Sequence, residues 1–364
     1  EKETLAWGYI QRNENGDMSG FMDAPRAPVK DQWSPRLGVG YPITDRTAFH
    51  FSYGQFYQFP DLVNMYNYSN YQGEGILPPG WSEEANDLAK DFLYGNPYYP
   101  FPYNITDWYI PEVGTPNVKP QRSVQYETGL RTRIGNQYLL TANLYYKDMF
   151  DYIASKRYDA DPSQYAIYEN MDYANSRGLE ISLKKLFSNG FDWDLNYTLA
   201  RAEGNAPTPD YHWYVAEWAS GYDWRDFNRT YTMPWDQTHT INFRLNYFTP
   251  TGFGLSSIAN YGSGLPYTPE DARARPIDEQ YSGRMPSTSN VNLKLFYDRK
   301  MMGYDIRFFA DITNLFDKEN VLAVDNTTGE PDATLDSGQS PMVVWKPYYI
   351  SAPRHIEIGI SISR

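Results

Sequence analysis

The stretch Phe191-Asp192-Trp193-Asp194-Leu195-Asn196-Tyr197-Thr198-Leu199 alternates large apolar residues with polar ones, without interruption. Successive side chains of a β-strand point to opposite faces, so this period of two predicts a strand with one apolar face and one polar face. The same alternation returns at 240–247, 304–312 and 355–362. These stretches together predict an all-β protein.

The segments between the predicted strands alternate in length. Short turns, most of them containing Gly, Asn or Pro, cover 42–46, 134–137, 188–190, 249–252 and 299–303. Gly and Asn supply the positive φ values that tight hairpins need. Long segments separate the resulting strand pairs, at 58–119, 151–172, 203–235, 263–288 and 315–352. Short turns on one rim and long loops on the other are typical of outer-membrane barrels, whereas soluble sandwiches have more even connections.

We therefore expect a transmembrane, antiparallel up-and-down β-barrel with about 12 strands, each of about 9–11 residues. That count includes a first strand near residues 5–11. No apolar stretch approaches the roughly 20 residues of a transmembrane helix, which excludes a helical membrane protein. Aromatic residues make up 17% of the chain, and an aromatic-rich soluble lectin or hydrolase could share that composition.

The charge and the residue types exclude several functions. The formal net charge of −13 argues against nucleic acid as a partner, because phosphate binding needs clustered Lys and Arg. The chain has no cysteine and its histidines are scattered without metal-ligand spacing, so no cofactor or metal site is expected. Paired carboxylates occur at 83–84 and at 192 and 194. Nothing in the sequence marks either pair as a catalytic acid and base, and no enzyme is predicted.

Short segments of the chain resemble, in the same order, motifs of the TonB-dependent receptors, in particular the Oar-like group with a carboxypeptidase-regulatory-like domain. The segments and the motifs they resemble are 33–41 (SPRLG), 49–60 (YGxFYQxP), 116–129 (LKP, then YExG), 175–180 (NxRGxE), 235–240 (WDQRHT) and 311–317 (NLFD). Together they extend the resemblance from residue 33 to the end of the chain.

The resemblance implies a barrel of about 22 strands that encloses a plug domain. Residues 1–364 would be the C-terminal portion of this outer-membrane barrel, with the plug and the N-terminal strands outside the chain. A complete small barrel is the alternative. The implied function is energy-coupled, TonB-dependent uptake of a scarce or bulky ligand, such as a siderophore, glycan or peptide, in the outer membrane of a Gram-negative bacterium. The expected partners are outer-membrane lipid and lipopolysaccharide, the receptor's own plug domain, a TonB-type energy coupler and a surface lipoprotein.

Two other functions remain open from the sequence. One is a non-transporting structural or adhesive surface barrel in an outer-membrane assembly. The other is a secreted all-β carbohydrate-binding protein or hydrolase, in which the charged strand face would contact solvent rather than a lumen.

The polar face of the predicted strands carries charges of both signs, which suits a hydrated lumen or a polar plug. A Lys or Arg facing lipid at the bilayer midplane would cost about 2–4 kcal/mol. The candidate lumen-facing and plug-facing residues are Glu127, Arg131, Arg133, Glu180, Asp192, Asp194, Arg244, Lys294, Arg307 and Asp311.

Aromatic residues crowd two of the long loops and are candidate ligand contacts, because exposed rings stack on sugars, peptides or chelates. The alternative is that these loops pack on one another or form an aromatic girdle. Acidic residues outnumber basic ones in 203–235, which disfavours a polyanionic ligand. The candidates are Tyr66, Tyr68, Trp81, Trp108, Tyr109, Trp213, Tyr214, Trp218 and Trp224.

Overall fold

The computed structural model describes the backbone of residues 4–5, 8–12, 18–21, 28–66, 112–158, 165–208, 229–271, 276–336, 341–345 and 347–363. The elements in these ranges are almost all β-strands. The helical ones are α1 (Leu62–Tyr66) and the short 3-10 helix η2 (Pro347–Tyr349). Within these ranges no helix is both long enough and apolar enough to cross a membrane.

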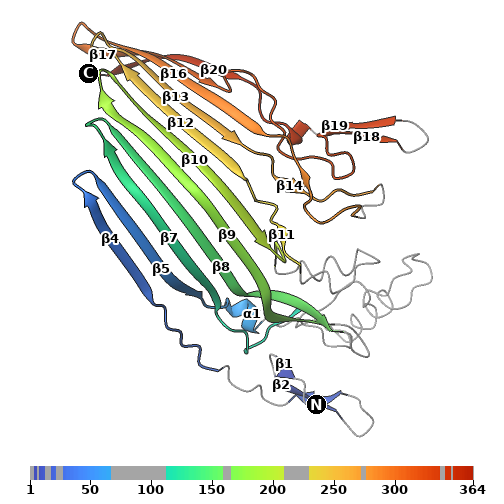
Figure 1. Cartoon of the computed structure of the whole chain (residues 1–364). Coiled ribbons are helices and arrows are strands. Elements are labelled where there is room, and N and C mark those ends of the chain that lie inside the picture. The colour runs from blue at the N-terminus through green and yellow to red at the C-terminus, as the bar shows by residue number, and fades with distance from the viewer. Residues whose placement is uncertain are drawn as a thin grey trace.

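One large antiparallel sheet dominates the described residues, and each full-length strand in it pairs with its neighbours along the chain (Figure 1). In sheet order the strands are β20 (His355–Ser363), β17 (Tyr304–Thr313), β16 (Thr288–Met301), β13 (Phe253–Gly262), β12 (His239–Phe248), β10 (Phe191–Gly204), β9 (Tyr165–Ser188), β8 (Tyr138–Tyr158), β7 (Gln121–Ile134), β5 (Thr47–Gln58) and β4 (Arg36–Thr44). Two short strands join its side: β11 (Tyr231–Thr232) pairs with β10, and β6 (Glu112–Val113) pairs with β9. The predicted all-β, up-and-down arrangement is confirmed, and the sheet is open at β4 and β20.

Three small sheets lie apart from the large one. They are β1 (Thr4–Leu5) with β2 (Gly8–Arg12) and β3 (Met18–Phe21), β14 (Pro266–Tyr267) with β15 (Gly283–Arg284), and β18 (Asp332–Asp336) with β19 (Pro341–Trp345). The first strand predicted near residues 5–11 falls on β1 and β2 and does not join the large sheet. A reversal that pairs Leu5 with Gly8 divides this stretch into two short strands that bond to each other.

The tight turns lie where the sequence predicts them, together at one end of the sheet (Figure 1). Asn189 and Gly190 have φ values of 55° and 84°, and Met302 and Gly303 have 53° and 82°. Positive φ at both central residues is the conformation of the two-residue turns that match the twist of paired strands. The longer connections leave from the opposite end, which we call the loop rim.

The predicted long connection at 151–172 is wrong for most of its length. β8 continues to Tyr158 and β9 begins at Tyr165, so the two strands form a long hairpin that extends past the other strands at the loop rim. The register shifts between Met149 and Ile153, and Asp151 has a φ of 59°. This bulge interrupts the alternation of side chains, and the interruption resembles the end of a strand in the sequence.

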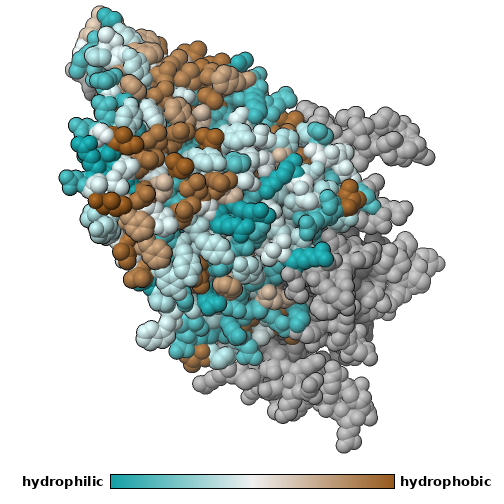
Figure 2. All heavy atoms as spheres, in the orientation of Figure 1, coloured by the Kyte–Doolittle hydropathy of each residue, from teal (hydrophilic) through white to brown (hydrophobic). Residues whose placement is uncertain are grey.

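The large sheet has two chemically different faces. On one, which we call the apolar face, Leu195 of β10 lies between Leu183 of β9 and Phe243 of β12. Figure 2 shows hydrophobic residues gathered in a band over the strands. The edge strand β20 has large apolar side chains exposed on this face, at Ile356, Ile358, Ile360 and Ile362. Exposed apolar surface on this scale predicts contact with another apolar phase rather than with water.

Among the described residues, a small cluster of buried apolar side chains lies at the loop rim. Beside it, the ammonium of Lys30 donates a hydrogen bond to the carbonyl oxygen of Pro116 at 2.6 Å, and partial burial lowers the pKa of Lys30. The sheet is therefore held by its backbone ladder and by contacts between neighbouring strands rather than by a central core. The cluster consists of Met65, Val118, Ile153 and Tyr168.

Two substitutions at adjacent positions of β10 test the assignment of the faces. Leu195→Arg places a charge on the apolar face, and we expect it to destabilise the membrane-folded protein by about 2–4 kcal/mol. Asn196→Arg points to the opposite face and is the matched control, with an expected change within about 0.5 kcal/mol. Urea titration of protein folded into lipid vesicles, followed by heat-modifiable gel mobility, measures both. Equal effects at the two positions would contradict the assignment.

Candidate functional site

The second face of the large sheet, which we call the polar face, gathers all the charged residues selected from the strand pattern. Direct cross-strand partners share a face, and such pairs link the strands in series. Asp194 is opposite both Lys184 and Arg244, and Lys294 is opposite Asp311. The alternation within each strand then places on this face Glu127, Arg131, Arg133, Glu180, Asp192, Asp194, Arg244, Lys294, Arg307 and Asp311.

Ion pairs join neighbouring strands across the polar face. Asp194 of β10 lies 3.7 Å from the ammonium of Lys184 on β9, and it forms a direct ion pair with Arg244 on β12. The ammonium of Lys294 on β16 lies 2.9 Å from the carboxylate of Asp311 on β17. Charges of opposite sign thus balance between adjacent strands.

The cationic side chains of these pairs remain in contact with solvent, whereas the side chain of Asp194 is 17% exposed. The side chains of Arg244 and Lys294 are 49% and 47% exposed. Exposed ion pairs contribute about 0–1 kcal/mol each, so they add little to the stability of the sheet. A hydrated face with balanced charge can contact and release a polar partner without removing a large apolar area from water.

A row of glycine and phenylalanine crosses the polar face on the turn side of these pairs. Gly254 is opposite Phe296, Phe296 is opposite Phe309, and Phe309 is opposite Gly359. A Cβ added at either glycine would overlap the neighbouring ring, so each glycine lets an aromatic side chain lie close to the sheet. The guanidinium of Arg307 lies 4.5 Å from the centre of the Phe296 ring.

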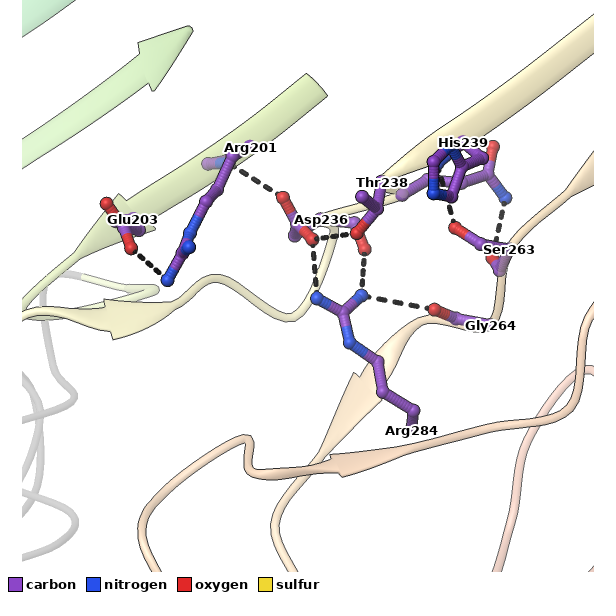
Figure 3. Close-up of polar contacts among 10 residues, drawn as sticks. Arg201, Glu203, Asp236, Thr238, His239, Ser263, Gly264 and Arg284 are labelled. Carbon is purple, nitrogen blue, oxygen red and sulfur yellow. Dashed lines mark hydrogen bonds and ion pairs between the residues drawn. The ribbon is translucent and has the colours of Figure 1, made fainter. Parts of the chain in front are cut away.

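A buried aspartate organises the loop rim between β10, β12 and β13 (Figure 3). The carboxylate of Asp236 accepts hydrogen bonds from the backbone N–H of Ala202 at 2.7 Å, from the hydroxyl of Thr238 at 3.1 Å and from the guanidinium of Arg284 at 2.7 Å. Arg284 also donates to the carbonyl oxygens of Asp236 at 2.9 Å and of Gly264 at 3.2 Å.

Asp236 is only 2% exposed, although it carries a charge. Burial of a carboxylate is tolerated where hydrogen bonds and a counter-charge replace water, and this site supplies both. The cluster joins β10 to the start of β12 and to the connection that contains β15. It therefore fixes the loop rim to the end of the sheet.

Polar groups also end the apolar face at the loop rim. Arg201 and Arg177 are direct partners on β10 and β9, and both bond to Glu203, at 2.6 Å and 3.0 Å (Figure 3 shows the Arg201 pair). Next to them, the hydroxyl of Tyr197 lies 3.0 Å from Nδ1 of His239. Such a change from apolar to polar side chains is expected where a membrane protein meets the headgroup region.

The loop aromatics proposed as ligand contacts lie outside the described residues. For Tyr66 the backbone is described, at the end of α1, but not the side chain. Among the residues that are described, no three His, Asp or Glu side chains gather as a metal site. The other aromatic candidates are Tyr68, Trp81, Trp108, Tyr109, Trp213, Tyr214, Trp218 and Trp224.

Comparison with protein families identifies the fold. The family described as TonB dependent receptor-like, beta-barrel matches residues 9–315. The chain belongs to this family. TonB-dependent receptor barrels lie in the outer membrane of Gram-negative bacteria and are transporters rather than enzymes. Membership also excludes the secreted, soluble protein that the sequence left open.

Solved structures of outer-membrane receptors share the receptor fold. They include the outer membrane transporter YddB from Escherichia coli, with 12% identity and a TM-score of 0.55, covering 90% of this chain and 40% of that one. A mutant of the ferric enterobactin receptor from Pseudomonas aeruginosa, in complex with enterobactin, has 16% identity and a TM-score of 0.54, covering 91% and 40%. FpvA of P. aeruginosa, bound to heterologous pyoverdines, has 10% identity and a TM-score of 0.52, covering 90% and 32%.

The receptor chain thus spans 40% or less of the length of these structures. Identities this low establish a shared fold and nothing about a shared ligand. A comparison of the sequence with curated proteins gave no match.

The buried aspartate predicts a local loss of stability when its carboxylate is removed. Asp236→Ala leaves the N–H of Ala202 without its acceptor and should cost about 1–3 kcal/mol. We expect faster hydrogen–deuterium exchange at 200–204 and 237–240. Asp305→Ala is the matched control, because Asp305 and its partner Lys300 are 63% and 73% exposed, and it should change stability by less than about 0.5 kcal/mol. Unchanged exchange at both segments would show that Asp236 does not hold the rim.

The glycine–phenylalanine row predicts a second difference between two similar positions. Gly254→Leu should displace the Phe296 ring and destabilise the receptor by about 1–3 kcal/mol. Gly38→Leu adds the same side chain to the polar face, but on β4. A Cβ at Gly38 meets nothing within 4 Å, so this substitution should leave stability nearly unchanged. Urea titration in lipid vesicles measures both, and similar effects would contradict the close packing of Phe296.

Proposed function

We propose that the chain forms part of the barrel of a receptor that imports a scarce or bulky ligand across the outer membrane with energy from a TonB-type coupler. The observation that carries the proposal is the contrast between the two faces of a sheet in this family. One face is apolar and suits lipid, and the other carries hydrated, balanced ion pairs such as Asp194 with Arg244. A lumen of this kind suits a polar plug that must move during transport.

The open edges of the large sheet support a larger barrel around this chain. β4 and β20 each pair with one strand only among the described residues. Unpaired backbone N–H and C=O groups are costly in hydrocarbon, so barrels in membranes close without edges. Further strands, pairing with β4 and with β20, would satisfy these groups. The chain would then be the C-terminal portion of the barrel, and a plug domain would lie against the polar face.

The loop end of the apolar face supports contact with lipopolysaccharide. Arg177 and Arg201 have side chains that are 45% and 58% exposed, at the level where the apolar side chains end. Arginine binds phosphate in a bidentate manner. The phosphate groups of lipopolysaccharide occur at this depth of the outer leaflet. A surface lipoprotein partner, and ligand contacts by the loop aromatics of 58–119 and 203–235, belong to the same proposal.

Deletion experiments in the bacterium test the proposal. Strains lacking the receptor gene, the TonB-type coupler or both are grown with one nutrient supplied only as a ferric siderophore, a glycan or a peptide. We expect one nutrient class for which all three strains lose uptake to the level of passive leakage. Restoration by the intact gene is the control for polar effects of the deletion.

Two results would decide against active import. Uptake that needs the receptor but continues without the coupler would show a passive barrel. Normal uptake of every class in the receptor deletion would favour the alternative, a structural or adhesive barrel that does not transport.

A further inference from the structure

The polar face contains a pocket at the loop rim with a volume of about 430 Å³. It lies between the loop ends of β12, β13 and β16 and the segments that follow β17 and precede β20. Pockets for small ligands commonly have volumes of about 300–1,000 Å³, so this one has room for a small-molecule ligand. No charged residue lines the pocket within the described part of the chain. The ion pair of Asp194 with Arg244 lies on the same face, two residues farther along the strands from Asn242.

Asparagines in register form one wall of the pocket. Asn242 on β12 is opposite Asn260 on β13, which is opposite Asn290 on β16. The amide nitrogen of Asn260 donates to the amide oxygen of Asn242 at 2.6 Å, and that of Asn290 donates to Asn292 at 3.1 Å. A primary amide has two donor hydrogens and two acceptor lone pairs, so these bonds leave donors on Asn242 and acceptors on Asn260 available. The amide oxygen of Asn290 is buried and contributes none.

Two further asparagines have a different role and hold the pocket in shape. Asn320 donates to the carbonyl oxygen of Ser289 at 2.9 Å and accepts from the N–H of Ser289 at 2.7 Å. Asn314 donates to the carbonyl oxygens of Lys318 and Ala352 at 3.0 Å and 3.2 Å. The Asn320 amide thus fixes its segment against β16, and the Asn314 amide joins the segment after β17 to the one before β20. These bonds therefore support the walls of the pocket.

The unused groups of the wall define the chemistry of the ligand. They include both donors and acceptors, spaced along a row about 5 Å apart from strand to strand. Sugar hydroxyls also donate and accept, and they occur at similar spacings along an oligosaccharide. A charged ligand would lose water in this pocket and meet no charged side chain in its lining, which is unfavourable. The nearby ammonium of Lys318 is already bonded to the hydroxyl of Ser289 at 2.9 Å.

We propose that this pocket binds a short, uncharged saccharide, with Asn242 and Asn260 as its hydrogen-bonding groups. The proposal rests on the proposed function and names the ligand class of the receptor. A peptide, whose termini are charged, and an anionic ferric chelate fit the uncharged lining less well. The same pocket filled by a segment of the plug is the competing occupant that the experiment must distinguish.

Calorimetric titration of the full-length receptor in detergent tests the proposal. The probes are maltotriose, cellotriose and xylotriose as neutral saccharides, with trialanine and a ferric catecholate as charged comparisons. We expect one saccharide to bind more tightly than both charged probes. Asn242→Leu and Asn260→Leu should each weaken that binding about ten-fold or more, since each leaves ligand groups without a partner. Asn196→Leu is the matched control, because Asn196 continues the row on β10 without lining the pocket, and should change binding less than about two-fold.

An isosteric variant guards against a folding defect. Asn242→Asp keeps an oxygen that accepts from Asn260 but replaces the free donor by a charge, and it should also weaken saccharide binding about ten-fold. Heat-modifiable gel mobility confirms that each variant is folded.

Three results would overturn the proposal. They are binding of no saccharide, saccharide binding that the pocket variants leave unchanged, and pocket variants that loosen the plug without changing saccharide affinity. Coupled uptake of another ligand class alongside any of them would leave the proposed function intact. Saccharide binding lost in the pocket variants, without any coupled uptake, would instead refute the transport function alone.

Discussion

In hydrocarbon, every backbone N–H and C=O group must find its partner within the protein. The ladder between neighbouring strands meets this requirement, and much of the receptor's structure depends on it. Once strands are paired, side chains can point only to lipid or to the lumen, and the period of two in Phe191 to Leu199 is the direct result. The ladder also explains why so few apolar residues are buried: the sheet needs no dry core to hold its shape.

The same constraint separates stability from function on the two faces. On the apolar face a charge is costly, and charged side chains such as Arg177 and Arg201 lie where that face ends. On the polar face, the ladder fixes the backbone positions, while the side chains can vary. The side chains there form successive rows across the strands. From loop rim to turns it presents an uncharged row of amides at Asn242 and Asn260, then ion pairs at Asp194 and Lys294, then the ring of Phe296 beside Gly254. The ion pair of Asp298 with Arg307 follows on the turn side of that ring.

The parts of the structure predicted from the sequence are those that depend on local pattern. Alternation and turn chemistry located the tight turns and predicted that Arg244 and Asp311 lie on one polar face, as the register shows. What the sequence alone missed requires register across strands. Asn196, Asn242, Asn260 and Asn290 each look like one polar residue in an alternating strand, and only their pairing aligns them. The bond between Arg284 and Asp236 joins residues 48 positions apart through a connection with no periodicity, although the motif at 235–240 marked one partner. At the bulge near Asp151 the alternation of apolar and polar residues stops, although β8 continues beyond it.

Pairing between neighbours along the chain also makes the hairpin a unit of evolutionary change. Each tight turn and its two strands contact only the hairpins on either side, so a hairpin can be duplicated or lost without rearranging the others. Within a hairpin, the loop tolerates insertions better than the strands do. Doubling a loop's length costs about 0.6 kcal/mol in closure entropy, whereas inserting one residue into a strand would exchange its lipid face for its lumen face. Selection for new ligands would therefore act quickly on the loop rim and slowly on the strands, and receptors of this family should diverge most in their loops.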